Sequence, residues 1–230
     1  MLRAGILDRL RSAALSRWWH PFGYVMAEVA RVLRADLADL PMGVAALDYG
    51  CGETQFRRHL PDHCRYVGAD LAGNPHADVE LRPDGGLPLP DETFDLVLSK
   101  QVLEHVPDPD LYLRESLRVL KPGGRLLLST HGLMFYHPVP DDFWRWTASG
   151  LREQVETSGF RVRSLEGVVG LVPTAIWLVS FKTSHRLPRG IRQAFVLACN
   201  LLMAILDRMT SRSSKVENAC VYAVAAVKPA

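Results

Sequence analysis

The chain has 230 residues, of which 48% are hydrophobic and 23% are charged, and its formal net charge is only +2. This length and composition fit one globular α/β domain with a substantial apolar core. The weak net charge gives no strong field for nucleic acid or for an anionic membrane, so a nucleic-acid-binding protein is not expected. None of the four cysteines forms a Cys-x-x-Cys pair, so we predict no metal site and expect reduced thiols in a cytoplasmic protein.

Residues 1–43 are expected to form N-terminal helices that are broken at 20–23 by the sequence His-Pro-Phe-Gly. The aromatic residues around this break suit either a lid over a cofactor or the packing side of an additional helix, and the sequence leaves both open. Charged residues interrupt the first turns too often for a signal peptide. No window reaches the roughly 20 uninterrupted apolar residues that a transmembrane helix needs.

From residue 44 onward, short apolar runs alternate with helical patterns. Strands are expected at 44–49, 66–69, 94–99, 125–130, 160–165 and 218–227. Helices are expected from the turn after residue 52 to about 60, at 109–120 and at 147–158, and residues 167–212 form a helical insertion before the last strand. This alternation predicts a mainly parallel sheet with helices on both faces, in which ligands bind beyond the carboxyl ends of the strands.

The first two loops at that edge carry glycines and acids. Gly50 and Gly52 allow a tight turn and a close approach to a ligand, and Asp48 is placed to accept hydrogen bonds or to face a cation. The dinucleotide fingerprint G-x-G-x-x-G fails, because Gln55 stands at its third glycine position. Asp70 ends the second strand 22 positions after Asp48, which is where an acid can take the hydroxyls of a ribose.

Several further motifs follow in order. They are Leu-Asp-Tyr-Gly-Cys-Gly at 47–52, the acid at 70, the stretch 87–95, Val-Leu-Glu-His-Val at 102–106 and Leu-Lys-Pro-Gly-Gly at 120–124. Together they resemble a class I S-adenosylmethionine-dependent methyltransferase, closest to the small-molecule branch often labelled type 11, over residues 44–130. The resemblance implies a Rossmann-like, doubly wound, mostly parallel seven-stranded sheet with the last strand antiparallel, in a methyltransferase domain over 44–230.

The resemblance also implies roles in holding S-adenosyl-L-methionine. The glycine turn passes beneath the methionine part, Asp70 holds the ribose, Leu71 packs on the adenine, and the residues after the fourth strand close the crevice near the sulfonium. The implied cofactor residues are Asp48, Gly50, Cys51, Gly52, Asp70, Leu71, Asp84, Gly85, Ser99, Lys100 and Gln101. The chain departs from the family pattern at Thr54, where many members have glycine, and at Asp84, which stands one position nearer the Leu-Pro pair than usual.

The acceptor site is expected on the loop 130–146, which follows the fifth strand and combines histidines, carboxylates and aromatic residues. Its candidate catalytic residues are His131, His137 and Asp141, with a histidine as base. This composition suits O-methylation of a small molecule, a sugar or a glycoconjugate. Amide, adenine and cytosine acceptors are disfavoured, because the motifs of those enzymes are missing after the fourth strand. An NAD(P)-dependent oxidoreductase and a non-catalytic cofactor-binding module remain as alternatives.

The insertion at 168–210 is apolar and carries Arg186, Arg189 and Arg192. One interpretation is an α-hairpin that packs on the core or across a homodimer. The other is a peripheral membrane surface that meets a lipid-linked acceptor, with the arginines facing anionic headgroups.

Overall fold

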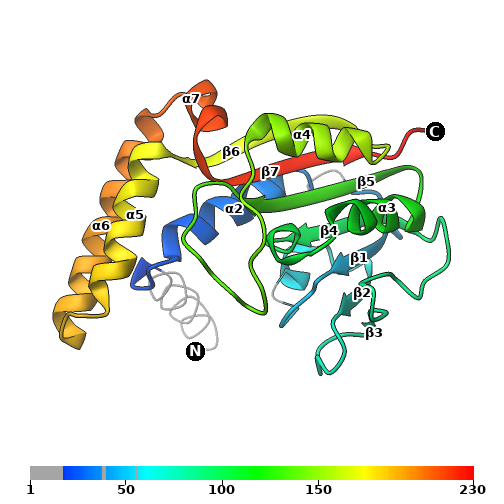
Figure 1. Ribbon diagram of the computed structural model, residues 1–230, viewed down its shortest axis with the longest axis horizontal. Coiled ribbons are helices and arrows are strands. Elements are labelled where there is room, and N and C mark those ends of the chain that lie inside the picture. The colour runs from blue at the N-terminus through cyan, green and yellow to red at the C-terminus, as the bar shows by residue number, and fades with distance from the viewer. Residues whose placement is uncertain (1–17, 38–39, 55) are drawn as a thin grey trace, which may run out of the picture.

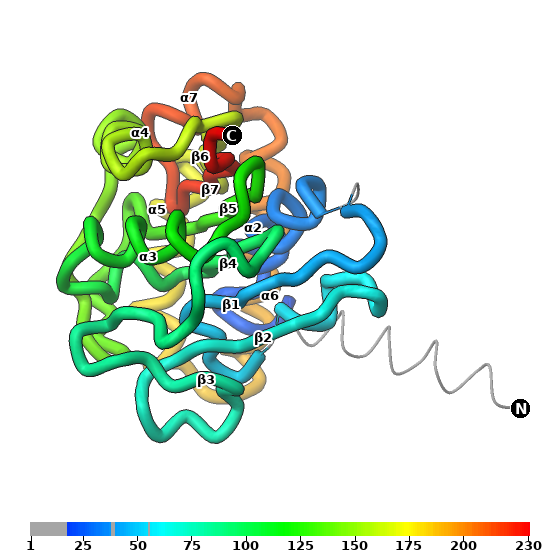
Figure 2. Tube along the Cα trace, turned by 90° about the vertical axis from the view of Figure 1, so that its right-hand side faces the viewer, coloured from blue at the N-terminus to red at the C-terminus, as the bar shows by residue number. Residues whose placement is uncertain are grey.

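The computed structural model describes residues 18–37, 40–54 and 56–230. Within these residues, a seven-stranded sheet lies between two layers of helices (Figure 1). The strands follow the order β3-β2-β1-β4-β5-β7-β6, which can be followed from bottom to top in Figure 2. The final strand β7 pairs antiparallel with both of its neighbours, while the other pairs are parallel. The predicted fold class is therefore confirmed.

The elements have the following bounds. The strands are β1 (Ala45–Tyr49), β2 (Arg65–Asp70), β3 (Val79–Glu80), β4 (Phe94–Lys100), β5 (Leu120–His131), β6 (Arg161–Gly170) and β7 (Ala219–Val227). The helices are α2 (Gly23–Ala35), α3 (Pro109–Val119), α4 (Ala148–Thr157), α5 (Leu171–Ser184), α6 (Arg189–Met209) and α7 (Arg212–Glu217). Single turns of 3₁₀ helix occur at Arg57–His59 and Leu103–His105.

Four local features differ from the expectations. In place of the helix expected before residue 60, the described residues form only the 3₁₀ turn Arg57–His59, whose three side chains are not buried. The flanking Phe56 and Leu60 are buried in the core, but Pro61 follows directly and Leu60 is already extended, so the turn does not continue as a helix. Strand β5 begins at Leu120 instead of 125, and β6 continues to Gly170, because both pair along their length with β7 or β4. The short strand β3 was not expected, and residues 1–17 lie outside the described part.

The two faces of the sheet build two separate cores. Along β1, Leu47 packs towards α3 and α4, whereas Ala46 packs towards α2 and the α5–α6 hairpin. Successive side chains of a strand point to opposite faces, so a strand covered on both faces reads as one continuous apolar run. This burial fixes the central strands and therefore the loops at their carboxyl ends.

The N-terminal segment and the insertion pack against each other. The Asn200 amide of α6 donates to the carbonyls of Trp18 (2.7 Å) and His20 (3.1 Å), and the Tyr24 hydroxyl donates to Asp207 (2.9 Å). Among the described helices, α6 alone has the length and hydropathy of a membrane span, with 28% of that window buried. Core helices of soluble proteins also reach these values, so this observation by itself places α6 in neither class.

Candidate functional site

A cavity of about 850 Å³ opens at the carboxyl ends of β1, β2, β4 and β5. Its wall is completed by parts of the N-terminal segment and of the loop after β5. Ten of the eleven predicted cofactor residues line it, and so do the predicted catalytic residues His131 and His137. The topology thus brings together loops that lie far apart in the sequence, as the sheet edge predicted.

Two predicted site residues do not line the cavity. Ser99 is buried, and its hydroxyl lies 2.8 Å from the hydroxyl of Tyr112, which in turn lies 2.9 Å from the carbonyl of Tyr49. Ser99 therefore supports the wall from behind, because its side chain points into the sheet's α3 face. Asp141 is exposed, and it contacts His105 Nδ1 through its backbone carbonyl.

The turn after β1 needs glycine for a steric reason. Gly50 has a φ of +83°, and a Cβ atom there would come within 2.6 Å of Val102 Cγ2. The amides of Gly50 and Cys51 both donate to the Ala69 carbonyl, at 2.8 and 3.1 Å. The backbone therefore crosses the sheet edge with no room for a side chain, and it leaves space above it for a ligand.

Asp70 is held in one orientation at the end of β2. Its Oδ1 accepts from the amide of Leu71 (2.8 Å), and its Oδ2 accepts from the amide of Gly52 (2.7 Å) and from Asn74 Nδ2 (2.8 Å). Leu71 beside it exposes half of its surface. A fixed carboxylate next to an exposed apolar side chain suits a ribose and an adenine ring. The sequence analysis did not single out Asn74, although it stands only four positions after Asp70.

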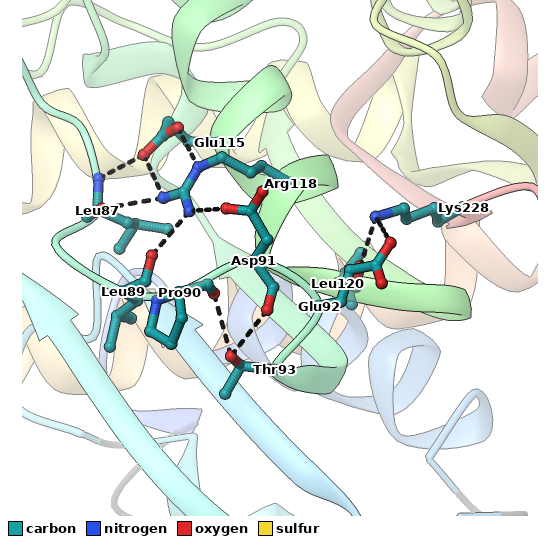
Figure 3. A network of polar contacts seen from close by, with 10 residues as sticks. All are labelled: Leu87, Leu89, Pro90, Asp91, Glu92, Thr93, Glu115, Arg118, Leu120 and Lys228. Carbon is teal, nitrogen blue, oxygen red and sulfur yellow. Dashed lines mark hydrogen bonds and ion pairs between the residues drawn. The ribbon is translucent and has the colours of Figure 1, made fainter.

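An ion pair on α3 holds the segment 87–91, which follows the cavity-lining turn at Asp84 and Gly85 (Figure 3). The guanidinium of Arg118 donates to the carbonyls of Leu87 (3.0 Å) and Leu89 (2.7 Å) and to Asp91 Oδ1 (2.6 Å). Glu115 accepts from the Leu87 amide at 2.7 Å, and its hydrogen bond with Arg118 lowers its pKa. This network fixes the segment that follows the predicted adenine-edge residues.

Those adenine-edge residues form a tight turn at the cavity wall. Asp84 Oδ1 accepts from the amide of Gly86 at 2.9 Å, and the Tyr49 hydroxyl donates to the carbonyl of Gly85. Both Asp84 and Gly85 line the cavity. Because Oδ1 of Asp84 caps the turn, its Oδ2 remains available to a ligand.

Two ionisable groups near the glycine turn are strongly affected by burial. Asp48 is only 2% exposed, and burial raises its pKa to about 6 although the Tyr66 hydroxyl donates to it at 2.8 Å. Burial also lowers the pKa of Lys100, which lines the cavity nearby. The pKa of the Cys51 thiol rises to about 12, mainly through burial, so Cys51 is a protonated wall residue and not a nucleophile.

Three histidines meet at the opposite end of the cavity. The ring centroids of His105, His131 and His137 lie 5.9 to 6.4 Å apart. Behind them, the fully buried Glu104 accepts from Thr130 Oγ1 at 2.8 Å, and its other oxygen lies 2.9 Å from His131 Nε2 without the geometry of a hydrogen bond. Glu104 stands in the Val-Leu-Glu-His-Val motif, but only its spatial neighbour His131 reveals its role.

Unpartnered polar atoms gather at this same end. Among the described residues, the buried side-chain atoms without a hydrogen-bond partner are Gln101 Oε1, Glu104 Oε1, His131 Nδ1 and Trp146 Nε1. Gln101 also has a φ of +56°, a backbone conformation that costs a non-glycine residue about 1 kcal/mol or more. Buried polar atoms are nearly always satisfied, and both strain and missing partners concentrate at functional sites.

The loop after β5 is locked over this end by Asp142. Its carboxylate binds the Arg145 guanidinium through both oxygens (2.5 and 2.6 Å) and accepts from the His137 amide at 2.6 Å. The hydrogen bond with Arg145 lowers the pKa of Asp142 to about 2. Arg145 also donates to the carbonyls of Met134 and Phe135, so the loop is held at both of its ends.

Residues 47–128 match the family of the methyltransferase domain. A protein of Mycolicibacterium smegmatis named "Probable S-adenosylmethionine-dependent methyltransferase" is 34% identical over 148 residues, which are 57% of this chain and 58% of that protein. These matches identify residues 47–128 as a methyltransferase domain similar to those of S-adenosylmethionine-dependent methyltransferases. A ubiquinone biosynthesis O-methyltransferase of Cereibacter sphaeroides is 31% identical over 51% of this chain and 60% of its own length. The chain thus spans about 60% of the length of these methyltransferase relatives.

Solved structures share the fold. A phosphoethanolamine N-methyltransferase of Haemonchus contortus, in complex with phosphomonomethylethanolamine and S-adenosylhomocysteine, aligns with a TM-score of 0.57 and 16% identity over 87% of this chain and 52% of that one. A structure described as the [4+2]-cyclase SpnF aligns with a TM-score of 0.58 and 23% identity over 87% and 80%. At these identities the likeness shows the methyltransferase fold alone, and a fold does not by itself fix a reaction.

S-adenosyl-L-methionine is the cofactor of this methyltransferase family. The residues present fit it, because the turn at Gly50 and Gly52 lines the cavity with backbone alone and a side chain at Gly50 would collide with Val102. Asp70 and Leu71 provide a carboxylate and an apolar surface at one end, and the buried Asp48 provides a second carboxylate at the other. The failed G-x-G-x-x-G fingerprint and the methyltransferase match over residues 47–128 make an NAD(P)-dependent oxidoreductase the weaker alternative.

Proposed function

We propose that this protein transfers the methyl group of S-adenosyl-L-methionine to a hydroxyl of a small molecule or a glycoconjugate. When bound, the cofactor supplies an electrophilic methyl group on a sulfonium with a good leaving group. The protein must then align the acceptor, exclude water and remove the hydroxyl proton. The observation that carries the proposal is the buried pair of Glu104 and His131 at the acceptor end of the cavity.

Glu104 acts as a positioning residue and His131 as the base. A carboxylate 2.9 Å from His131 Nε2 would favour the tautomer with its proton on Nε2, which would leave the lone pair on Nδ1, an atom without a hydrogen-bond partner among the described residues. The acceptor O–H bond breaks and its proton goes to Nδ1. Methyl transfer to the acceptor oxygen would break the carbon–sulfur bond of the bound cofactor and leave S-adenosylhomocysteine, while Asp70 and Leu71 would hold its ribose and adenine.

His137 is the second candidate base. Burial and the neighbouring histidines lower its pKa, so the ring stays neutral at pH 7 and keeps a lone pair. It lines the same end of the cavity as His131. Asp141 is the weaker candidate, because its side chain is exposed and does not line the cavity.

The acceptor end combines polar atoms with an apolar wall. The apolar side chains of Phe22, Met26, Met134 and Val139 line the same cavity as the histidines. Such a lining suits a ring that carries a hydroxyl. The loop composition suggests a sugar or a glycoconjugate as the acceptor. The names of two relatives, a ubiquinone biosynthesis O-methyltransferase and a hydroquinone methyltransferase, support a hydroxylated ring as a further candidate.

The test measures S-adenosylhomocysteine release with a panel of phenols and quinols, sugars and glycolipids, and amines. We expect turnover with a hydroxyl acceptor, and we expect His131→Asn and Glu104→Gln to lower kcat by two to four orders of magnitude. Calorimetric titration with S-adenosylhomocysteine should give unchanged affinity for both variants and a loss in Asp70→Ala. His76→Ala is the matched control, since His76 is exposed and does not line the cavity.

Full turnover in His131→Asn, His137→Asn and Asp141→Asn would overturn the assignment of the base. Turnover with amines but not with hydroxyl compounds would overturn O-methylation and leave the methyltransferase assignment intact. Binding of S-adenosylhomocysteine without turnover on any member of the panel would favour the non-catalytic binding module.

A further inference from the structure

The α6 helix exposes a continuous apolar stripe. Ile191, Leu201, Leu202, Ile205 and Met209 are each between 46 and 78% exposed. With the exposed Ala194 and Ala198, they follow the three- and four-residue spacing of one helix face over five turns. The opposite stripe of α6 is the buried one, at Val196, Asn200, Met203 and Asp207. The helix is therefore apolar towards solvent as well as towards the protein.

The partner helix α5 adds to this exposed surface. Leu171, Val172 and Val179 are 49 to 62% exposed. Figure 1 shows the two helices side by side at one edge of the molecule, beyond the last strands of the sheet, with their connecting turn at the end farthest from α7. Soluble monomers rarely expose so many large apolar side chains on one supersecondary unit, and such surfaces mark contacts with proteins or membranes.

The charges around the hairpin are of one sign. Residues 171–216 contain seven of the chain's 27 lysines and arginines but one of its 25 acids, so this segment carries a formal charge of +6 while all other residues together carry −4. The single acid is Asp207, which is buried and bonded to Lys215 and Tyr24. Lys182, Arg186, Arg189 and Arg192 gather at the hairpin turn, where the described residues offer the arginines no ion pair.

This combination selects one kind of partner. Exposed apolar helices flanked by unpaired cations are typical of elements that lie in the interface of a bilayer with anionic lipids. A second copy of the same positive hairpin would bring like charges together, which disfavours a symmetric dimer through this face. A spanning helix is also disfavoured, because the Asn200 amide and the Asp207 carboxylate of α6 are already bonded to the N-terminal segment.

The hairpin also borders the acceptor end of the cavity. Phe22 lines the cavity and meets Trp177 and Phe181 of α5 with ring centroids 5.2 Å apart. Phe135, from the loop after β5, stacks on Phe181 at 4.4 Å. A hairpin lying on a membrane would therefore hold the acceptor end of the cavity close to the lipid surface.

We propose that the exposed face of the α5–α6 hairpin docks on the surface of a bilayer that contains anionic phospholipids. The apolar stripe enters the boundary between headgroups and acyl chains, and the arginines at the turn contact the phosphates. Docking goes beyond the proposed methyl transfer and does not depend on it. Under the proposed function, it would give a lipid-soluble hydroxyl acceptor a short path into the cavity.

The test is flotation of the full chain with vesicles of phosphatidylcholine alone and of phosphatidylcholine with 30% phosphatidylglycerol. We expect binding to the anionic vesicles, weakened by high salt. Leu201→Glu/Ile205→Glu should lower the bound fraction at least tenfold. Arg186→Glu/Arg189→Glu should remove the preference for anionic vesicles. Met42→Glu is the matched control, because Met42 is an exposed apolar residue (80%) outside the hairpin, and it should bind like the wild type.

Calorimetry with S-adenosylhomocysteine and a thermal melt accompany each variant, so that a misfolded variant or a missing cofactor site is recognised separately. Absence of wild-type flotation with both vesicle types would overturn the proposal. Equal flotation of the wild type and both double variants would also overturn it. A wild-type dimer that becomes monomeric in Leu201→Glu/Ile205→Glu, without vesicle binding, would instead assign this face to a second copy of the chain.

Discussion

Replacing Asp48 by asparagine should remove one source of the pH dependence of stability. Burial raises the pKa of Asp48 from 3.8 to about 6, so the folded protein binds this proton more tightly than the unfolded chain does. The resulting stabilisation is fully present below pH 3.8 and is lost as the pH rises through about 6. Linkage between these two pKa values gives a loss of about 1.4 kcal/mol in unfolding free energy between pH 5 and pH 7.5 from this group alone.

The assay is urea unfolding of the wild type and Asp48→Asn at both pH values. Asparagine does not titrate, and the two proteins share all other ionisable groups. From pH 5 to pH 7.5, the unfolding free energy of the variant should therefore rise by about 1.4 kcal/mol relative to that of the wild type. Tyr66→Phe is informative as well, because its hydroxyl donates to Asp48 and favours the ionised form. Removing it should move the pH window upward. A difference between the wild type and Asp48→Asn that does not change with pH would refute the reasoning.

The other predictions concern three supports of the site. Gly50→Ala should lower the unfolding free energy in urea by about 2 kcal/mol or more, because φ is +83° and Val102 blocks the new Cβ atom. Adding Val102→Ala should recover the part of this loss that comes from the collision with Val102, but not the part that comes from the positive φ. Arg118→Met should cost about 1–3 kcal/mol in a thermal melt and weaken S-adenosylhomocysteine binding, because carbonyls of the loop lose their donor. Asp142→Asn should lower turnover at unchanged S-adenosylhomocysteine affinity. The pKa of Asp142 is lowered in the folded wild type, so its carboxylate stabilises the loop less and less as the pH falls from about 4 towards 2. Asp142→Asn lacks this pH dependence, and hydrogen exchange of the loop amides would show the difference.

The cofactor half of the site was predictable because its signals are local. Gly50 and Asp70 each stand directly at the end of a strand whose apolar run is visible in the sequence. Parallel pairing of β1 and β2 then places these loops side by side without further information. The sequence could not show that the Ser99 side chain turns towards Tyr112, because that depends on which face of β4 meets α3.

The acceptor half was less predictable because its contacts join distant segments. Glu104 lies in the 3₁₀ turn Leu103–His105 and His131 ends β5, 27 positions later, and no periodicity links them. His137 and Asp141 looked equivalent as titratable residues of one loop. Only the fold shows that Asp142 bonds Arg145 and turns the loop so that His137, and not the exposed Asp141, lines the cavity.

The polar residues of α6 decide how the insertion meets the rest of the chain. Burying an unpaired amide or carboxylate costs several kcal/mol, so Asn200 and Asp207 must face partners. They stand seven positions apart, two helical turns, and both meet the N-terminal segment. That requirement fixes the rotation of α6 about its axis, and it turns Ile205 and the other large apolar side chains outward. The exposed apolar stripe is therefore a consequence of the orientation that the buried polar groups enforce, and a helix placed only to fill the core would have carried its polar residues on that outer side.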